Sequence, residues 1–358
     1  MTKKFEITLS DRKKEILLSA VESYIDNALP ITSEKVQNTI FSNLSSATLR
    51  NELSALEEMG YLKQLHTSSG RVPTTKAYRY FVDNLLSSGS IVPKDVDMVK
   101  DKFVRRSAFI LDIVDDIAKS VGKIVDYPTF VTLSGYDKLL IEQVNIIPLI
   151  TGQALLLIKT NGGIINNTIT LKDNVGEENC KDASKFLTTN LMNKKICDVL
   201  NNFDEYQKLF ENQIKYFQDF FVQLTTLLKA YVDGGTHILN HGNTTKMLES
   251  PEYKDLDSAK KFINLVENEQ VIKDAIANID ENTKSDIVFS IGEENEDKDL
   301  NDYSIVKANY TLNSGIVASI GVVGPQRLDY AKIAGALKYV CDEIREINDN
   351  KEDVDGKK

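Results

Sequence analysis

The chain has 358 residues, 42% of them hydrophobic, and its 43 basic and 53 acidic side chains give a formal net charge of −10. This length predicts two or three folded domains, and the acidic balance excludes a protein that coats nucleic acid through charge alone. The sequence shows no charged segment followed by a short apolar segment of the kind found in signal peptides, no apolar run long enough to span a bilayer, and only three scattered cysteines. We therefore expect a cytoplasmic protein without a membrane partner, a disulfide framework or a four-ligand zinc site.

Two helices are expected before residue 45. Ser10 is typical of an N-cap, and apolar residues recur at helical spacing between Ile16 and Ile25. Pro30 ends this helix, and the hydroxyl residues at positions 32 and 33 begin a shorter helix that runs to Ile40. Together the two helices would support a third one, as in a helix-turn-helix unit.

The third expected helix begins at Ser45 or Ser46 and has one apolar and one polar face. Leu49, Leu53 and Leu56 recur at helical spacing and form the buried face. An Arg bonds two guanine acceptors at once and an Asn bonds adenine in the same way, so the polar face predicts a helix that reads a major groove. The candidate DNA-binding residues of this helix are Ser46, Ala47, Thr48, Arg50, Asn51 and Ser54.

A short hairpin is expected directly after this helix. Gly60 ends the helix, residues 61–65 alternate like a half-buried strand, and residues 71–73 form the return strand. This order is that of a winged-helix DNA reader. The alternative, a helical hairpin followed by an ordinary β-hairpin with a solvated Arg50, stays open from spacing alone. Further candidate DNA contacts in the wing are His66, Thr67, Ser68 and Arg71, of which Arg71 is expected near the wing tip.

Strand-like and helical segments alternate in the remainder of the chain. One helix is expected to end near residue 122, a long one covers residues 204–232, and a last one covers residues 325–347. Strand-like runs are expected at residues 130–133, 139–150, 154–159, 164–171, 287–291, 304–312 and 316–323. This order predicts an α+β fold with a mostly antiparallel sheet.

The helix expected over residues 204–232 carries more apolar surface than one neighbour would cover. Such a face needs a partner, either within the chain or in another copy of it. The candidate dimer contacts are Phe217, Phe220, Phe221 and Leu224. Burial of this helix within its own domain is the alternative that the sequence leaves open.

The segment from Ser45 to Asp83 resembles the reader domain of the heat-inducible transcription repressors of the HrcA family. The residues that carry the resemblance are Ser45, Ala47, Thr48, Leu49, Arg50, Asn51, Leu56, Glu57, Gly60, Leu62, His66, Thr67, Ser68, Gly70, Arg71, Pro73, Thr74, Tyr78, Arg79, Phe81, Val82 and Asp83. Two departures, Leu65 in place of Pro and Ala77 in place of Gly, flank the wing and put its geometry in doubt.

Later motifs extend this resemblance over nearly the whole chain. Residues 291–295 (IGEEN) and 321–330 (GVVGPQRLDY, with Gln326 and Leu328 substituted) resemble family motifs, and residues 242–253 match more weakly. The resemblance implies four parts. These are a winged-helix domain at 1–86, a GAF-like α+β domain at 87–172 and 246–347, an inserted, largely helical dimerisation domain at 173–245, and a tail at 348–358 that we expect to be disordered.

Residues that would support catalysis or hold a cofactor are not evident. The sequence has no phosphate-binding loop, nucleophile elbow or dinucleotide fingerprint. Glu293 and Glu294 are adjacent, which favours a polar loop or a cap over an acid–base dyad, and His237 and His241 lack a third metal ligand nearby. We therefore expect no enzyme activity, no cofactor and no metal.

Two functions from different classes follow from these observations. The first is a dimeric repressor that binds double-stranded operator DNA. Here the resemblance implies an inverted repeat upstream of chaperone operons and a GroEL-type chaperonin that keeps the repressor active. The second is a transcription regulator gated by a small molecule in the GAF-like domain. The first is favoured, because the sequence shows no evident ligand-binding motif.

Overall fold

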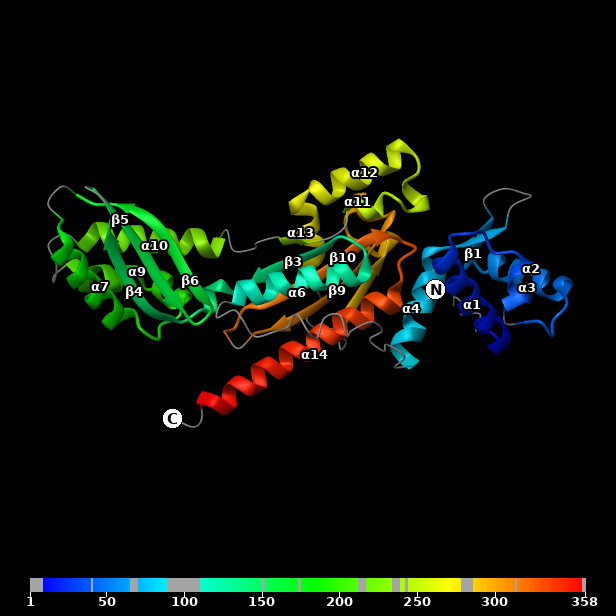
Figure 1. The fold of residues 1–358 in the computed structure, drawn as a ribbon, viewed down its shortest axis with the longest axis horizontal. Coiled ribbons are helices and arrows are strands. Elements are labelled where there is room, and N and C mark those ends of the chain that lie inside the picture. Colours follow the sequence, from blue (N-terminus) through cyan, green and yellow to red (C-terminus); the bar gives the residue numbers. More distant parts are fainter. Residues whose placement is uncertain are drawn as a thin grey trace, which may run out of the picture.

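The chain is described by a computed structural model. Its described residues are 9–39, 41–64, 70–88, 110–149, 152–172, 175–211, 217–233, 239–241, 244–277, 286–312 and 314–355. The molecule is elongated and has three parts in a row: an N-terminal helical unit, a central sheet covered by helices, and a second sheet with its own helices (Figure 1). No helix among the described residues is both long and apolar enough to cross a membrane.

The N-terminal unit, called the reader below, has the expected order of elements: α1 (Asp11–Asn27), α2 (Ser33–Thr39), α3 (Ser46–Glu58), β1 (Leu62–Gln64), β2 (Arg71–Pro73) and α4 (Thr75–Ser88). The predicted N-caps are confirmed, since the Ser45 hydroxyl accepts from the amide of Thr48 at 3.1 Å. Gly60, at φ +77°, ends α3. The amides of Gly60 and Tyr61 donate to the carbonyls of Glu57 and Leu56, which satisfies the last turn of the helix.

The wing is joined to the helices by a backbone bridge. β1 and β2 pair antiparallel, with Leu62 opposite Pro73. The amide of Ile31 donates to the carbonyl of Arg71 at 2.7 Å, and the amide of Arg71 returns the bond at 2.9 Å. A Cβ on Gly70 would lie 2.6 Å from the Ile31 carbonyl oxygen, so only glycine allows this approach. The base of the wing is thus fixed to the segment between α1 and α2.

The central part, called the body below, is a three-layer α/β/α structure. Its five strands are antiparallel and run in the order β7-β3-β10-β9-β8. The strands are β3 (Thr129–Ser134), β7 (Leu239–His241), β8 (Ile287–Ile291), β9 (Tyr303–Thr311) and β10 (Val317–Pro325). The helices are α6 (Ile110–Val125), α11 (Thr244–Met247), α12 (Leu256–Glu267), α13 (Glu269–Ala277) and α14 (Tyr330–Asp355).

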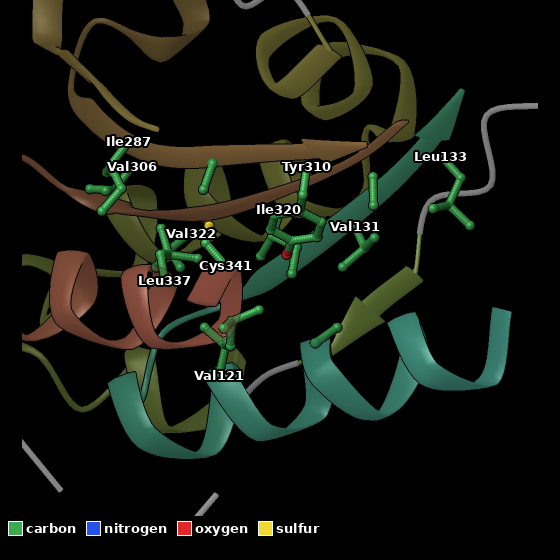
Figure 2. Packing of buried hydrophobic residues seen from close by; sticks show 14 of the residues in the cluster. Val121, Val131, Leu133, Ile287, Val306, Tyr310, Ile320, Val322, Leu337 and Cys341 are labelled. Carbon is green, nitrogen blue, oxygen red and sulfur yellow. The ribbon is translucent and has the colours of Figure 1, made fainter. Parts of the chain in front are cut away.

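Each face of this sheet has its own hydrophobic core, because alternate residues of a strand point to opposite faces. Residues such as Ile320 and Val322 pack against α6 and α14 (Figure 2). On the other face, Val323 packs with Phe262 of α12 and Ile276 of α13. A Cβ on Gly321 would lie 2.6 Å from Ile276, so this motif glycine lets α13 reach the sheet. The helices α11–α13 were not anticipated from the sequence.

The third part, called the inserted region below, is larger than expected. The strands β4 (Ile141–Pro148), β5 (Gln153–Thr160) and β6 (Gly163–Thr170) form a separate three-stranded sheet. It packs with the helices α7 (Glu177–Leu191), α8 (Ile196–Asn201), α9 (Phe203–Glu211) and α10 (Phe217–Asp233). The sheet topology therefore places the boundary near Gly135, before these strands, and the expected boundary at residue 172 divides a single packed unit.

Side chains close both edges of this three-stranded sheet. At the β4 edge, the Thr188 hydroxyl accepts from the amide of Val144 and donates to its carbonyl, both at 3.0 Å. Ser184 accepts from the amide of Ile146 at 2.8 Å. At the β6 edge, the amide group of Gln223 bonds both backbone groups of Thr170 at 3.0 Å. The backbone of the outer strands is thus partly satisfied without further strands.

The structure corrects the two expectations about long helical segments. The helix expected over residues 204–232 is instead two helices, α9 and α10, on either side of residues outside the described part. The tail expected to be disordered is helical as far as Asp355, because α14 continues well beyond the predicted end at residue 347. The side chains of its last residues lie outside the described part.

The aromatic face of α10 is covered within the chain, which is the alternative to a dimer contact that the sequence left open. Phe220 is 3% exposed, and Phe221 and Leu224 are fully buried. Phe221 stacks on Phe203 of α9 with ring centroids 5.3 Å apart. The side chain of Phe217 lies outside the described part. Sequence reasoning treated α10 as one long helix and therefore missed α9 as its partner.

Candidate nucleic-acid interface

The recognition helix α3 is fixed by its apolar face and exposes the opposite one. Leu49, Leu53 and Leu56 are fully buried. The side chains on the other face that are exposed to solvent are Ser46, Ala47, Arg50 and Asn51. The guanidinium and amide groups proposed to bond base edges are therefore presented on the first two turns of the helix.

Three of the predicted contact residues of α3 have partners in the reader. The hydroxyls of Ser46 and Ser33 lie 3.1 Å apart, which joins the first turns of α2 and α3. The Thr48 hydroxyl lies 2.9 Å from that of Ser45. Ser54 accepts a hydrogen bond from Arg71 at 2.9 Å. These hydroxyls position the helix, and their contacts with DNA stay predictions.

Arg71 lies at the base of the wing and its side chain turns back onto α3. Its Nε donates to Glu57 Oε2 at 2.7 Å and a terminal nitrogen donates to Ser54. The side chain is only 16% exposed. The sequence placed Arg71 near the wing tip because it follows Gly70, and its pairing with a residue 14 positions away was not visible from local spacing.

The turn of the wing lies outside the described residues, and with it His66, Thr67 and Ser68 and the departure at Leu65. The other departure, Ala77, is fully buried in the first turn of α4. Its amide donates to the carbonyl of Thr74 at 2.9 Å, as in a regular helix start. The strands on both sides of the turn pair in register, so the alanine is compatible with a wing.

Side chains that sequence reasoning missed also hold α3 in place. Glu52 pairs with Lys13 of α1 at 2.8 Å. The Lys76 ammonium donates to the carbonyl of Met59 at 2.8 Å, next to the negative end of the α3 dipole, and lies over the Tyr61 ring at 4.2 Å. Charge spacing within one helix could not reveal these pairs, because their partners lie on other elements.

The adjacent carboxylates at residues 293 and 294 are part of a turn and not an acid–base pair. Glu294 accepts from the amide of Ile291 at 2.9 Å and from Arg79 of the reader. Asn295 is buried and its amide donates to the carbonyls of Gly292, Leu300 and Tyr303. Within the described residues, no group of His, Cys, Asp and Glu is arranged to hold a metal ion.

Comparison with known proteins assigns the family. The family described as "Winged helix-turn-helix transcription repressor, HrcA DNA-binding" matches residues 8–85, and "HrcA protein C terminal domain" matches residues 111–334. The chain belongs to the HrcA family. The reader of this HrcA chain is therefore the DNA-binding domain of a transcription repressor.

Curated relatives and one solved structure agree with this assignment. The heat-inducible transcription repressor HrcA of Thermoanaerobacter sp. (strain X514) is 32% identical, over 96% of this chain and 98% of its own. That of Ruminiclostridium cellulolyticum is 29% identical, over 94% and 97%. A structure titled "Crystal structure of a hypothetical protein at 2.2 A resolution" has a TM-score of 0.67 at 20% identity, over 95% of this chain and 98% of that one. It shares the fold, with a winged helix and a GAF-like domain.

Proposed function

We propose that this HrcA-family chain represses heat-shock operons that encode chaperones by binding an inverted-repeat operator as a homodimer. The observation that carries the proposal is the exposed pair Arg50 and Asn51 on an α3 whose opposite face is fully buried. Each recognition helix enters the major groove of one half-site. Because residues 1–86 hold only 11 basic against 10 acidic residues, affinity depends on base contacts more than on general attraction to phosphates. The DNA that it regulates places its action in the bacterial cytoplasm.

The dimer is proposed to form through the outward face of the inserted region. Of the nine large apolar side chains found exposed among the described residues, six lie between positions 147 and 222, namely Ile147, Leu149, Ile164, Met192, Leu209 and Val222. Ile147 pairs with Leu155 across β4 and β5, and Ile164 lies on the same face of the sheet. A second copy packed on this face of the sheet would cover Ile147 and Ile164, whereas the aromatic residues Phe220 and Phe221 of α10 are already covered by the chain itself.

The GroEL-type chaperonin is proposed to act by supplying folded repressor. Under this mechanism the chaperonin changes how many repressor molecules can bind, and heat diverts it to other unfolded proteins. The family assignment supports this mechanism. The division of the chain into three parts also supports it, with the reader and the inserted region at opposite ends of the body (Figure 1).

A small-molecule-gated regulator is the second candidate, and one observation favours it. A cavity of about 460 Å³ lies between the reader and the body and is lined by polar and charged side chains, among them Lys63, Lys261, Asp302 and Arg327. A ligand in this cavity would touch both parts and so could bias one against the other.

Selection of binding sites from random DNA tests the proposed function. The purified protein should enrich two copies of one half-site in inverted orientation, and the same repeat should occur upstream of chaperone genes in the source genome. Enrichment of a single half-site would remove the dimer from the proposal. Enrichment that appears only after a metabolite extract is added would favour the ligand-gated regulator.

A further inference from the structure

Four sequence motifs outside the predicted DNA-contact residues meet at the junction between the reader and the body. Residues 78–83 belong to α4 of the reader. The motifs at 291–295 and 321–330 belong to the body, and so does the last part, residues 251–253, of the weaker motif at 242–253. Three hydrogen bonds between the reader and the body at this junction join residues more than 200 positions apart in the sequence. Because the four motifs meet at one junction, we expect their residues to share a role there.

The first clamp is the guanidinium of Arg79, midway along α4. Its Nε donates to one oxygen of Glu294 at 2.7 Å, and a terminal nitrogen donates to the other oxygen. The same nitrogen donates to the carbonyl of Phe289 in β8 at 2.8 Å. Two parallel bonds to a carboxylate fix the plane of both groups, which a lysine could not do.

The second clamp is the guanidinium of Arg327, which links the body to α1. Its Nε and one terminal nitrogen bond the carboxylate of Glu252 at 2.5 and 3.1 Å. The other terminal nitrogen donates to the carbonyl of Ile25 at 2.5 Å. Ile25 lies in the last turn of α1, where carbonyls lack a partner within the helix and a cation is favoured by the helix dipole.

A close approach between the two clamps leaves no room for a side chain on Gly292. The Thr75 hydroxyl at the start of α4 donates to Gln326 at 3.1 Å, and Gln326 in turn donates to the carbonyl of Asn301 at 2.9 Å. A Cβ on Gly292 would lie 2.8 Å from the Thr75 hydroxyl and 2.5 Å from the Gln326 amide nitrogen. Gly292 also has φ +56°, which favours glycine.

These contacts bind the body to two helices of the reader, α1 at its C-terminal end and α4 at Thr75 and Arg79. Because two helices are held at once, the reader can neither slide nor rotate freely on the body. We propose that Arg79 and Arg327 are positioning residues for operator recognition, which set the separation and angle of the two recognition helices in the dimer. The inference deepens the proposed function, because it requires a dimer on an inverted repeat. One inserted base pair turns a half-site by about 35° about the DNA axis, so a fixed reader tolerates one spacing only.

Binding to operators of different half-site spacing tests this inference. The double variant Arg79→Gln/Arg327→Gln is compared with the wild-type protein and with Arg12→Gln, a matched change on a reader arginine that is 57% exposed. Fluorescence anisotropy is recorded for a single half-site and for inverted repeats whose spacing changes one base pair at a time. Circular dichroism checks that each variant is folded.

The wild-type protein and Arg12→Gln should bind one spacing at least tenfold more tightly than its neighbours, since a second linked contact adds about 10²-fold or more to affinity. In the double variant, affinity for the single half-site should stay within twofold. Affinity for the best spacing should fall about tenfold, and the spacing preference should flatten. A spacing preference as sharp as that of the wild type would overturn the inference.

The other outcomes separate this inference from the proposed function. Equal wild-type affinity for a half-site and for every repeat would contradict the dimeric repressor itself. A loss of half-site affinity in the folded double variant would mean that the arginines act within the reader, which also overturns the positioning role. If the double variant is unfolded, Gly292→Ala tests the same junction by crowding Thr75 and Gln326, and it should flatten the spacing preference as well.

Discussion

Arg71 shows how one residue of the wing can support a recognition helix. Its guanidinium is bonded to Glu57 and Ser54, which lie one turn apart on α3. The wing therefore braces the helix from the side through a charged hydrogen bond. Arg50 and Asn51, by contrast, are exposed on the opposite side from the leucines. The two kinds of residue should respond differently to substitution.

Replacing Arg50 or Asn51 by Ala should reduce operator affinity by about 1 to 3 kcal/mol and relax base choice at one position in each half-site. The free energy of unfolding should hardly change, because both side chains are exposed. Titration against operators with each base substituted measures the effect. Arg12→Ala and Asn27→Ala, which change the same residue types on α1, are the matched controls. Unchanged base preference in both α3 variants would remove this helix from the groove.

Arg71→Ala should lower the free energy of unfolding by about 1 to 3 kcal/mol, because Glu57 loses its charged hydrogen-bond partner. The slope of log affinity against log salt concentration should change little, since the guanidinium is already paired before DNA binds. Chemical denaturation and binding at several salt concentrations measure the two effects. A slope lower by about one unit, with stability intact, would instead identify Arg71 as a phosphate contact.

The elements that the sequence predicted correctly are those whose signals lie close together in the chain. The N-cap at Ser45, the glycine that ends α3 and the strand at 71–73 each depend on neighbouring residues. In the strands at 141–170, apolar and polar residues alternate as clearly as in those of the body. This alternation shows which face of a strand is buried but not which strand it pairs with, so the strands of two sheets were assigned to one sheet. For the same reason the sequence showed the motif residues Arg79 and Glu294 but not their bond.

One polar contact between elements makes stability depend on pH. Lys307 of β9 is 5% exposed and donates to the carbonyl of Ala275 in the last turn of α13 at 2.7 Å. Burial lowers the pKa of Lys307 from 10.5 to about 8, although Glu296 acts in the opposite direction. Between these two values the unfolded chain binds a proton that the folded chain does not, so stability rises as pH increases from 8 toward 10.5.

Lys307→Met should remove this dependence. The free energy of unfolding of the wild type minus that of the variant should rise by up to about 1.4 kcal/mol per pH unit above pH 8, because one proton is linked to unfolding. Denaturant titrations at pH 7.5, 8.5 and 9.5 measure this difference. The buried tyrosines and cysteines contribute equally to the pH dependence of both proteins, so their contributions cancel in the difference. A difference that is constant across this range would mean that Lys307 titrates near its ordinary pKa in the folded protein.

At the scale of the whole molecule, the inserted region lies far from the reader, so changes there should affect operator binding only through the dimer (Figure 1). Ile147→Lys/Ile164→Lys should yield monomers by light scattering and weaken binding to the paired half-sites about 10²-fold or more. Leu256→Lys, at a residue that is 68% exposed on α12, is the control. A dimer that survives the double substitution would place the interface elsewhere. Phe221→Glu should unfold the inserted region, because that ring is fully buried.

Heating should reveal whether the supply of folded repressor controls activity. After a mild heat pulse the purified protein should lose operator-binding sites irreversibly, and a GroEL-type chaperonin should restore them without changing the affinity of each active dimer. Titration to stoichiometric saturation separates the active fraction from the dissociation constant. A full active fraction without chaperonin would contradict the supply mechanism and favour a ligand in the cavity between reader and body.

The outer strands of the three-stranded sheet are closed in part by hydroxyl and amide side chains of α7 and α10, and at Ile141 by backbone bonds to Asn193 and Lys194. If heat detaches α7 or α10, the backbone groups that these side chains bond at Val144, Ile146 and Thr170 lose their partners, and more of the strand edge is left unpaired. Such an edge is a template for pairing with another chain. Heat-damaged repressor should therefore aggregate through β4 or β6. A chaperonin that binds the opened chain would keep these edges from meeting those of a second copy.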